Sequence, residues 1–270
     1  MAQNILIVVQ ARMASSRLPG KVMMPLLGKS LLARMVERLQ TIKHDATIVI
    51  ATSVNPEDDI IEQEAMLIDV PCYRGSANNL LERHYMTAVK NSADIVLKIP
   101  SDCPLIDPKI IDEVLNFFFQ YRGKYDYVSN LHPATWPDGN DVEIMTMACL
   151  EKNWRLATRP LELEHTTPYI WENPDQFRIG NVSWSSGLDY SMSHRFTIDY
   201  TEDYKFIKCV YEELYPNNPG FSCDDILNLL IKKPDIYNIN AAYAGVNWYR
   251  HHLKELNTIS VQQTKIVVKK

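Results

Sequence analysis

A short loop near the start of the chain carries three positive charges among small residues. Arg12, Arg17 and Lys21 lie within residues 10–21, which follow the apolar, β-branched run of residues 5–9. Backbone N–H groups in such a loop can cradle phosphate oxygens, and arginine and lysine side chains neutralise the phosphate charge. The spacing therefore predicts a site for a phosphate or triphosphate, with a solvated surface loop of incidental charges as the alternative.

Two aspartates that are far apart in the sequence each follow a short apolar run. Asp102 comes after residues 95–99, and Asp199 comes after residues 196–198. Mg²⁺ prefers hard oxygen ligands, often one or two carboxylates together with substrate phosphates. If both runs are neighbouring strands, the two carboxylates could hold one ion between them. The alternative role for each aspartate, taken alone, is to cap a helix or make a turn.

Strand-like and helix-like segments alternate along most of the chain. Such alternation predicts βαβ units and an α/β fold with three layers, α/β/α, around a mostly parallel, Rossmann-like sheet. Ligands bind beyond the carboxyl ends of the strands in such sheets, which is where the loops 10–21 and 100–107 should open. The predicted strands are residues 5–9, 47–52, 72–74, 95–99 and 196–198, and the predicted helices are residues 31–42, 78–90, 108–121 and 201–215, with a further helix start at Asn55.

The middle and the end of the chain have a different pattern. Residues 130–193 begin with a turn-rich loop, and we interpret them as an insertion over the sheet edge that binds an acceptor or a second subunit. Strands are predicted at residues 142–147 and, less regularly, at residues 259–268. These patterns predict a single domain over residues 1–240 and a C-terminal extension over residues 241–270.

The composition excludes several classes of protein. The chain has 270 residues, 46% of them hydrophobic, a formal charge of −5 and a pI near 5.8, whereas a nucleic-acid-binding domain is usually basic. No apolar stretch is long enough for a membrane span, and the start lacks the pattern of a signal peptide. The five cysteines are scattered without a CxxC pair, so we expect free thiols in the cytoplasm and no zinc site.

Together these motifs resemble the cytidylyltransferases of the CMP-sugar synthetase superfamily, most of all the group called spore-coat polysaccharide biosynthesis protein F. The resemblance runs from about residue 4 to about residue 207. Its most specific part is residues 11–21, which is similar to the nucleotide-binding loop of the family. Residues 73–76 and 81–83 resemble its second nucleotide-side motif.

Further segments extend the resemblance toward the metal and the acceptor. Asp102 and Asp199 fall on the two metal aspartates of the family, residues 136–143 resemble its acceptor-side segment, and residues 164–169 resemble a further signature. Two positions depart from the pattern and bear on acceptor choice or loop geometry. They are Ser101, where a glycine is usual, and Asn140, where a bulkier apolar residue is common.

The resemblance implies a nucleotide-diphospho-sugar-transferase type of fold and transfer of CMP from CTP to a small acidic or phosphorylated acceptor, with Mg²⁺ as cofactor and a homodimer as assembly. It implies catalytic roles for Arg12, Lys21, Asp102 and Asp199, the two aspartates being the metal ligands. The implied nucleotide-binding residues are Ala11, Arg12, Ser15, Ser16, Arg17, Lys21, Arg74, Ser76 and Asp102. The implied acceptor-binding residues are Asp138, Asp141, Glu143, Glu164 and His165.

Two other functions compete with this hypothesis. A nucleotide-sugar-dependent glycosyltransferase would share the fold, but such enzymes usually carry an Asp-x-Asp metal motif, and Asp102 is followed by Cys103 and Pro104. A catalytically silent nucleotide-binding protein would have lost a metal acid or a phosphate cation, and all of them are present. The cytidylyltransferase hypothesis requires the carboxyls of Asp102 and Asp199 to meet near Lys21.

Overall fold

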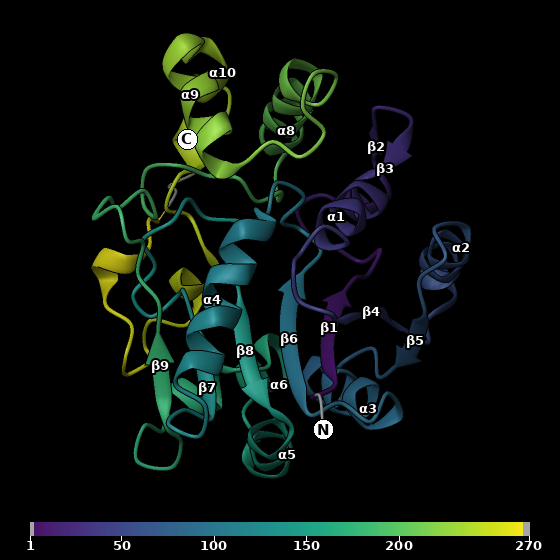
Figure 1. Ribbon diagram of the computed structural model, residues 1–270, viewed down its shortest axis with the longest axis vertical. Coiled ribbons are helices and arrows are strands. Elements are labelled where there is room, and N and C mark those ends of the chain that lie inside the picture. Colours follow the sequence, from purple (N-terminus) through teal and green to yellow (C-terminus); the bar gives the residue numbers. More distant parts are fainter. Residues whose placement is uncertain (1–2, 267–270) are drawn as a thin grey trace.

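A central sheet of seven strands organises the described part of the chain, residues 3–266 of this computed structural model (Figure 1). Its strands are β1 (Ile5–Gln10), β4 (Thr47–Ser53), β5 (Cys72–Gly75), β6 (Ile95–Pro100), β7 (Tyr127–Ser129), β8 (Glu143–Thr146) and β9 (Ile179–Asn181). They lie in the order β5-β4-β1-β6-β8-β7-β9. β8 pairs antiparallel with β6 and β7, and the other pairs are parallel, so the predicted mostly parallel sheet is confirmed.

Helices cover both faces of the sheet, which confirms the three-layer prediction. β1 alternates between the layers: Ile5, Ile7 and Val9 belong to one core, and Leu6 and Val8 to the other. The first core also contains residues of α1 (Leu31–Leu39), α2 (Asp59–Leu67), α4 (Pro108–Gln120), α8 (Thr201–Leu214), α9 (Cys223–Lys232) and α10 (Pro234–Asn238). The second contains residues of α3 (Leu80–Lys90), α5 (Met147–Leu156), α6 (Pro160–His165) and α7 (Pro168–Trp171).

Capping side chains start several helices where the sequence predicted them. Ser30 Oγ accepts a hydrogen bond from Ala33 N at 2.9 Å and begins α1 after the small hairpin of β2 (Pro25–Leu26) and β3 (Lys29–Ser30). Asp107 accepts from Lys109 N and begins α4. The predicted start at Asn55 is instead a 3₁₀ turn, Pro56–Asp58, and α2 begins at Asp59.

Two segments differ from their predicted arrangement. Residues 130–193 supply β8 and β9 to the sheet itself, with β8 between β6 and β7, so they do more than cover its edge. The strand predicted at residues 259–268 is wrong for the described residues, which contain the 3₁₀ turn Val261–Gln263. Lys265 N donates to Gly245 O at 2.7 Å, so this backbone pairs with a nearby turn and not with a strand. Residues 267–268 lie outside the described residues.

No helix in residues 3–266 is both long enough and apolar enough to cross a membrane.

Candidate active site

The cationic loop after β1 is held in a fixed turn that directs Lys21 inward. Met13 N donates to Asp58 Oδ1 at 2.7 Å, and Gly20 N donates to Met13 O at 2.9 Å. Gly20 adopts φ +70°, a left-handed conformation that glycine reaches without strain. The 3₁₀ turn Lys21–Met23 follows directly and buries the Lys21 side chain.

Lys21 joins the two predicted metal aspartates. Its Nζ lies 3.0 Å from Asp102 Oδ2 and 2.9 Å from Asp199 Oδ1, and it donates to Ile198 O at 2.7 Å. Burial lowers the pKa of Lys21, but the two carboxylates raise it by more, so the pKa is raised overall. The Lys21 side chain is therefore a permanently charged ammonium. Asp102 and Asp199, which lie 81 and 178 positions further along the chain, meet around its Nζ, as the hypothesis required.

The strand predicted at residues 196–198, just before Asp199, is wrong. Its backbone bonds to two different loops instead of one neighbouring strand: Ile198 N donates to Asp102 O at 2.9 Å, and Phe196 N donates to Asp138 O at 2.6 Å. Gly139 makes the second contact possible, since a Cβ there would lie 2.6 Å from the carbonyl carbon of Phe196. These bonds, not a sheet ladder, place Asp199 beside Asp102.

A buried arginine that the sequence did not single out links three carboxylates below the site. Arg195 has a side chain only 1% exposed, and it contacts Asp138 Oδ2 at 3.1 Å, Asp199 Oδ2 at 2.9 Å and Asp203 Oδ1 at 3.0 Å. Asp203 also accepts from Asp199 N and Tyr200 N at the start of α8. The spacing Arg-x₃-Asp-x₃-Asp was the only sign of this ionic network in the sequence. Nothing in the sequence indicated that the distant Asp138 also contacts Arg195.

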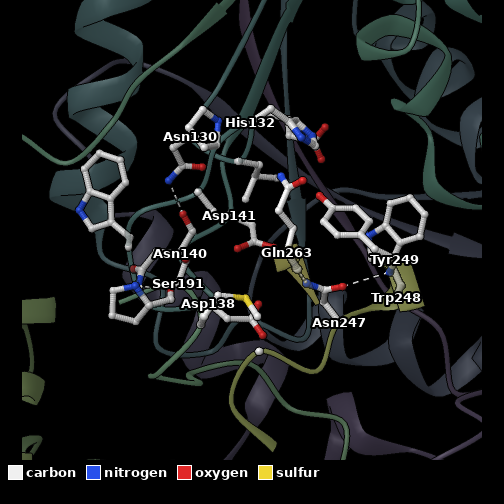
Figure 2. Close-up of a pocket in the computed structure, with 18 of the residues that line it drawn as sticks. Asn130, His132, Asp138, Asn140, Asp141, Ser191, Asn247, Trp248, Tyr249 and Gln263 are labelled. Atoms are coloured by element: carbon white, nitrogen blue, oxygen red, sulfur yellow. Dashed lines mark hydrogen bonds between the residues drawn. The ribbon is translucent and has the colours of Figure 1, made fainter. Parts of the chain in front are cut away.

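Two adjoining cavities run along this edge of the sheet. The first, of about 390 Å³, is lined by the cationic loop and both metal candidates. The second, of about 310 Å³, lies against the turn at residues 136–141 and the C-terminal segment (Figure 2). Shared wall residues make the two cavities neighbours, and these are Gln10, Lys98, Asp138, Asp141, His165, Asn247 and Trp248.

The structure brings most of the predicted nucleotide-binding residues to the first cavity but not all of them. Arg74 turns away, because its guanidinium contacts Asp59 at 2.6 Å and Glu62 at 3.0 Å at the start of α2. Ser76 Oγ accepts from Asn79 N in the turn before α3. Neither of the two residues lines the cavity. The predicted residues that do line it are Ala11, Arg12, Ser15, Ser16, Arg17, Lys21 and Asp102.

Arg83, which the resemblance places in the same nucleotide-side motif as Arg74, does reach the first cavity. It lines the first cavity, is buried, and forms no ion pair with any of the described residues; its Nε has no hydrogen-bond partner. Burial and, to a smaller extent, the neighbouring charge of Arg12 lower its pKa to about 10. A buried cation without a carboxylate is costly to the fold, so an anionic ligand is the natural partner of this side chain.

The predicted acceptor-binding residues line the two cavities, but several of them are already engaged by other side chains. Glu143 is engaged by Lys98 and by the Tyr127 hydroxyl. Glu164 contacts Arg12 Nη2 at 2.6 Å across the mouth of the first cavity. His165 stacks on Trp248 with ring centroids 3.7 Å apart. Burial lowers the pKa of His165 to about 3, so this histidine is a neutral packing group at working pH.

Asp141 forms no ion pair with any of the described residues, and its contribution to the stability of the fold should depend on pH. Burial raises its pKa to about 6, with Asp102 adding repulsion, whereas its unfolded value is about 4. The folded state therefore holds the extra proton between pH 4 and 6 and loses stability as pH rises through this window. We expect Asp141→Asn to raise the melting temperature above pH 6, with the gain vanishing near pH 4.

Melting curves of both proteins from pH 4 to 8 measure this difference. Asp175→Asn, the same change at an exposed position away from the cavities, serves as the control. An equal difference between Asp141→Asn and the parent protein at pH 4 and pH 8 would contradict the assignment.

Comparisons with known proteins give a consistent result. The chain matches the model of a family described as cytidylyltransferase over residues 6–220. It is 30% identical to the spore coat polysaccharide biosynthesis protein SpsF of Bacillus subtilis, over 86% of this chain and 96% of the relative. A cytidylyltransferase structure from Leptospira borgpetersenii superposes with a TM-score of 0.82 and 35% identity, over 87% of this chain and 97% of that one.

A more distant structure shares the fold. It is a CMP:2-keto-3-deoxy-manno-octonic acid synthetase complexed with CTP, with a TM-score of 0.59 at 16% identity, over 78% of this chain and 99% of that one. At this identity the likeness concerns the architecture alone.

Proposed function

The chain belongs to the cytidylyltransferase family, and from that premise we propose that it transfers CMP from CTP to an acidic sugar or to a phosphorylated or phosphonate acceptor, in surface polysaccharide or glycoconjugate biosynthesis. The observation that carries the proposal is the meeting of Lys21, Asp102 and Asp199 at the wall of one cavity. Cytoplasmic location remains a prediction from the scattered cysteines and the missing signal-peptide pattern. Assembly as a homodimer remains a prediction from the family resemblance and from residues 130–193.

The proposed reaction is an in-line displacement at the α-phosphorus of CTP. An acceptor oxygen forms a new bond to this phosphorus, the bond to the bridging oxygen of the β-phosphate breaks, and pyrophosphate leaves. Positioning and charge neutralisation dominate such reactions. Lys21 and Arg17 both contact Asp199 in the first cavity, where they can hold the leaving phosphates.

The residues present fit a magnesium ion. Two carboxylates converge on Lys21, and the Asp102 side chain is partly exposed to the cavity, so Asp102 and Asp199 offer the hard oxygen ligands that Mg²⁺ shares with phosphates. No group of three acidic, histidine or cysteine side chains that could enclose a metal occurs within residues 3–266, which suits an ion completed by substrate oxygens. Bound there, Mg²⁺ would neutralise charge on the phosphate oxygens.

An assay of pyrophosphate release tests the proposal. The protein is incubated with Mg²⁺, each of the four ribonucleoside triphosphates and a panel of sugar acids, polyol phosphates and phosphonates. We expect release that depends on CTP and on one class of acceptor. Binding of CTP without turnover on any acceptor would refute the proposal and favour a silent nucleotide-binding protein.

Arg83 gives a separate test of where the triphosphate binds. We expect Arg83→Met to raise the KM for CTP by about tenfold or more, because a charged hydrogen bond is lost. The free energy of unfolding should stay unchanged or rise, because the variant removes an unpaired buried cation. Steady-state kinetics and urea unfolding measure the two effects.

Arg74→Met is the matched comparison for this test. The Arg74 guanidinium pairs with acids of α2, so its loss should change the KM for CTP less. A larger effect at Arg74 than at Arg83 would restore the assignment made from the sequence.

A further inference from the structure

The second cavity adjoins the nucleotide-side cavity and has a wall that the family motifs do not include. Asn247, Trp248 and Tyr249 line it from the C-terminal segment, which lies beyond the part of the chain that matches the family model, residues 6–220. Figure 2 shows Asp141 between Asn140 on one side and Tyr249 on the other. Because the proposed CTP site occupies the first cavity, the second is the place for the acceptor.

The second cavity offers no free positive charge from the described residues. Lys98 is its only lysine or arginine, and Glu143 binds the ammonium of this lysine. Burial lowers the pKa of His132 to about 4 and that of His165 to about 3, so both rings are neutral. An anionic group on the acceptor substrate would therefore find no unpaired cation among the described residues that line this cavity.

Negative charge, by contrast, is left uncompensated. Asp138 is paired with Arg195. Asp141, in contrast, forms no ion pair with any of the described residues, and its Oδ1 accepts a long hydrogen bond from Gly139 N at 3.3 Å. Gln10 Oε1 is buried without a hydrogen-bond donor in the same wall. The cavity wall therefore presents protein oxygens that lack a hydrogen-bond donor, and those of the Asp141 carboxylate also carry a negative charge.

Aromatic rings line the same cavity as Asp141. Trp136, Trp171, Trp248, Tyr249 and His132 all line the cavity. Trp171 and Tyr249 meet edge to face with centroids 6.3 Å apart, and Trp248 is fixed by its stack on His165. The faces of tryptophan and tyrosine attract cations, most strongly where water is excluded.

We propose that the acceptor carries a protonated amine, which Asp141 and the aromatic wall of the C-terminal segment hold in the second cavity. The inference rests on the proposed function, because it assumes that the second cavity holds the acceptor of the transfer. The oxygen that attacks the α-phosphorus then belongs to the other end of the same molecule, toward the cations of the first cavity. The acceptor is thus zwitterionic, with its amine remote from the reacting oxygen.

Matched pairs of acceptors test the proposal. One pair is 3-deoxy-manno-octulosonate and its 8-amino-8-deoxy analogue, and the other is 2-hydroxyethylphosphonate and 2-aminoethylphosphonate. Within the pair that is turned over, we expect kcat/KM to favour the amine by about tenfold or more, as for a hydrogen bond to a charged partner. Equal values, or a preference for the hydroxyl compound, would overturn the inference and leave the proposed function standing.

Variants separate amine recognition from a general effect on catalysis. Asp141→Asn should remove the preference by lowering kcat/KM for the amine and sparing the hydroxyl analogue. Asp175→Asn, at an exposed position outside both cavities, should leave the preference unchanged. Equal loss for both members of the pair in Asp141→Asn would show a structural or catalytic role and would refute recognition of the amine.

A binding measurement decides the matter if no acceptor is turned over. Three tryptophans line the cavity, so intrinsic fluorescence reports its occupation by each of the four compounds. Tighter binding of the amines, lost in Asp141→Asn, would support the inference while the proposed function fails. Binding without preference, or no binding, would overturn the inference.

Discussion

Replacing Lys21 with alanine is expected to lower the rate of pyrophosphate release by about 10²–10³-fold, the usual cost of removing one preorganised charge partner. The structure gives the reason. Lys21 Nζ contacts the carboxylates of both Asp102 and Asp199, and the raised pKa keeps this side chain charged throughout the working range. Without it, the carboxylates repel each other, and the leaving phosphates lose a cation.

The fold should survive this change, because Asp199 keeps Arg17 at 2.7 Å and Arg195 at 2.9 Å. Pyrophosphate release and a thermal melt on the same sample separate activity from stability. Asp102→Asn should cause a similar loss, whereas Lys29→Ala, at an exposed lysine paired with Glu37, should keep the parental rate. Turnover of Lys21→Ala near the parental rate would remove Lys21 from the chemistry.

The centre of the site could be predicted because it follows from the topology of the sheet. Loops after neighbouring parallel strands open at one edge, and β1 pairs with β6, so the loop that bears Lys21 had to lie near Asp102. The place of Asp199 was also expected, but for the wrong reason. It depends on two backbone bonds between loops, which no periodicity in the sequence encodes.

The direction of single side chains and the contacts of irregular segments could not be predicted. Arg74 lies on the edge strand β5, where the sequence does not reveal that α2 offers two carboxylates to it. Trp248 and Tyr249 belong to a segment of short turns without a periodic apolar pattern. Their role as a cavity wall appears only once the chain returns over the sheet edge (Figure 1).

Arg195→Met should be the most destabilising single substitution near the site. Its guanidinium contacts Asp138, Asp199 and Asp203, and it donates to Val246 O at 2.8 Å. Removing one partner of a buried ionic network leaves uncompensated charges and typically costs about 3–5 kcal/mol of unfolding free energy. For a chain of this size, we expect the melting temperature to fall by roughly 6–20 °C.

Arg178→Met is the matched control for this prediction, because Arg178 also pairs with a carboxylate, that of Asp126, but its side chain is 60% exposed. An exposed pair contributes about 1 kcal/mol or less, so urea unfolding should show a clear gap between the variants. Adding Asp138→Asn to Arg195→Met should recover part of the loss, since one of the stranded charges disappears. A loss at Arg195 no larger than that at Arg178 would mean that solvent, not Arg195, compensates these carboxylates, and their arrangement would then need another cause.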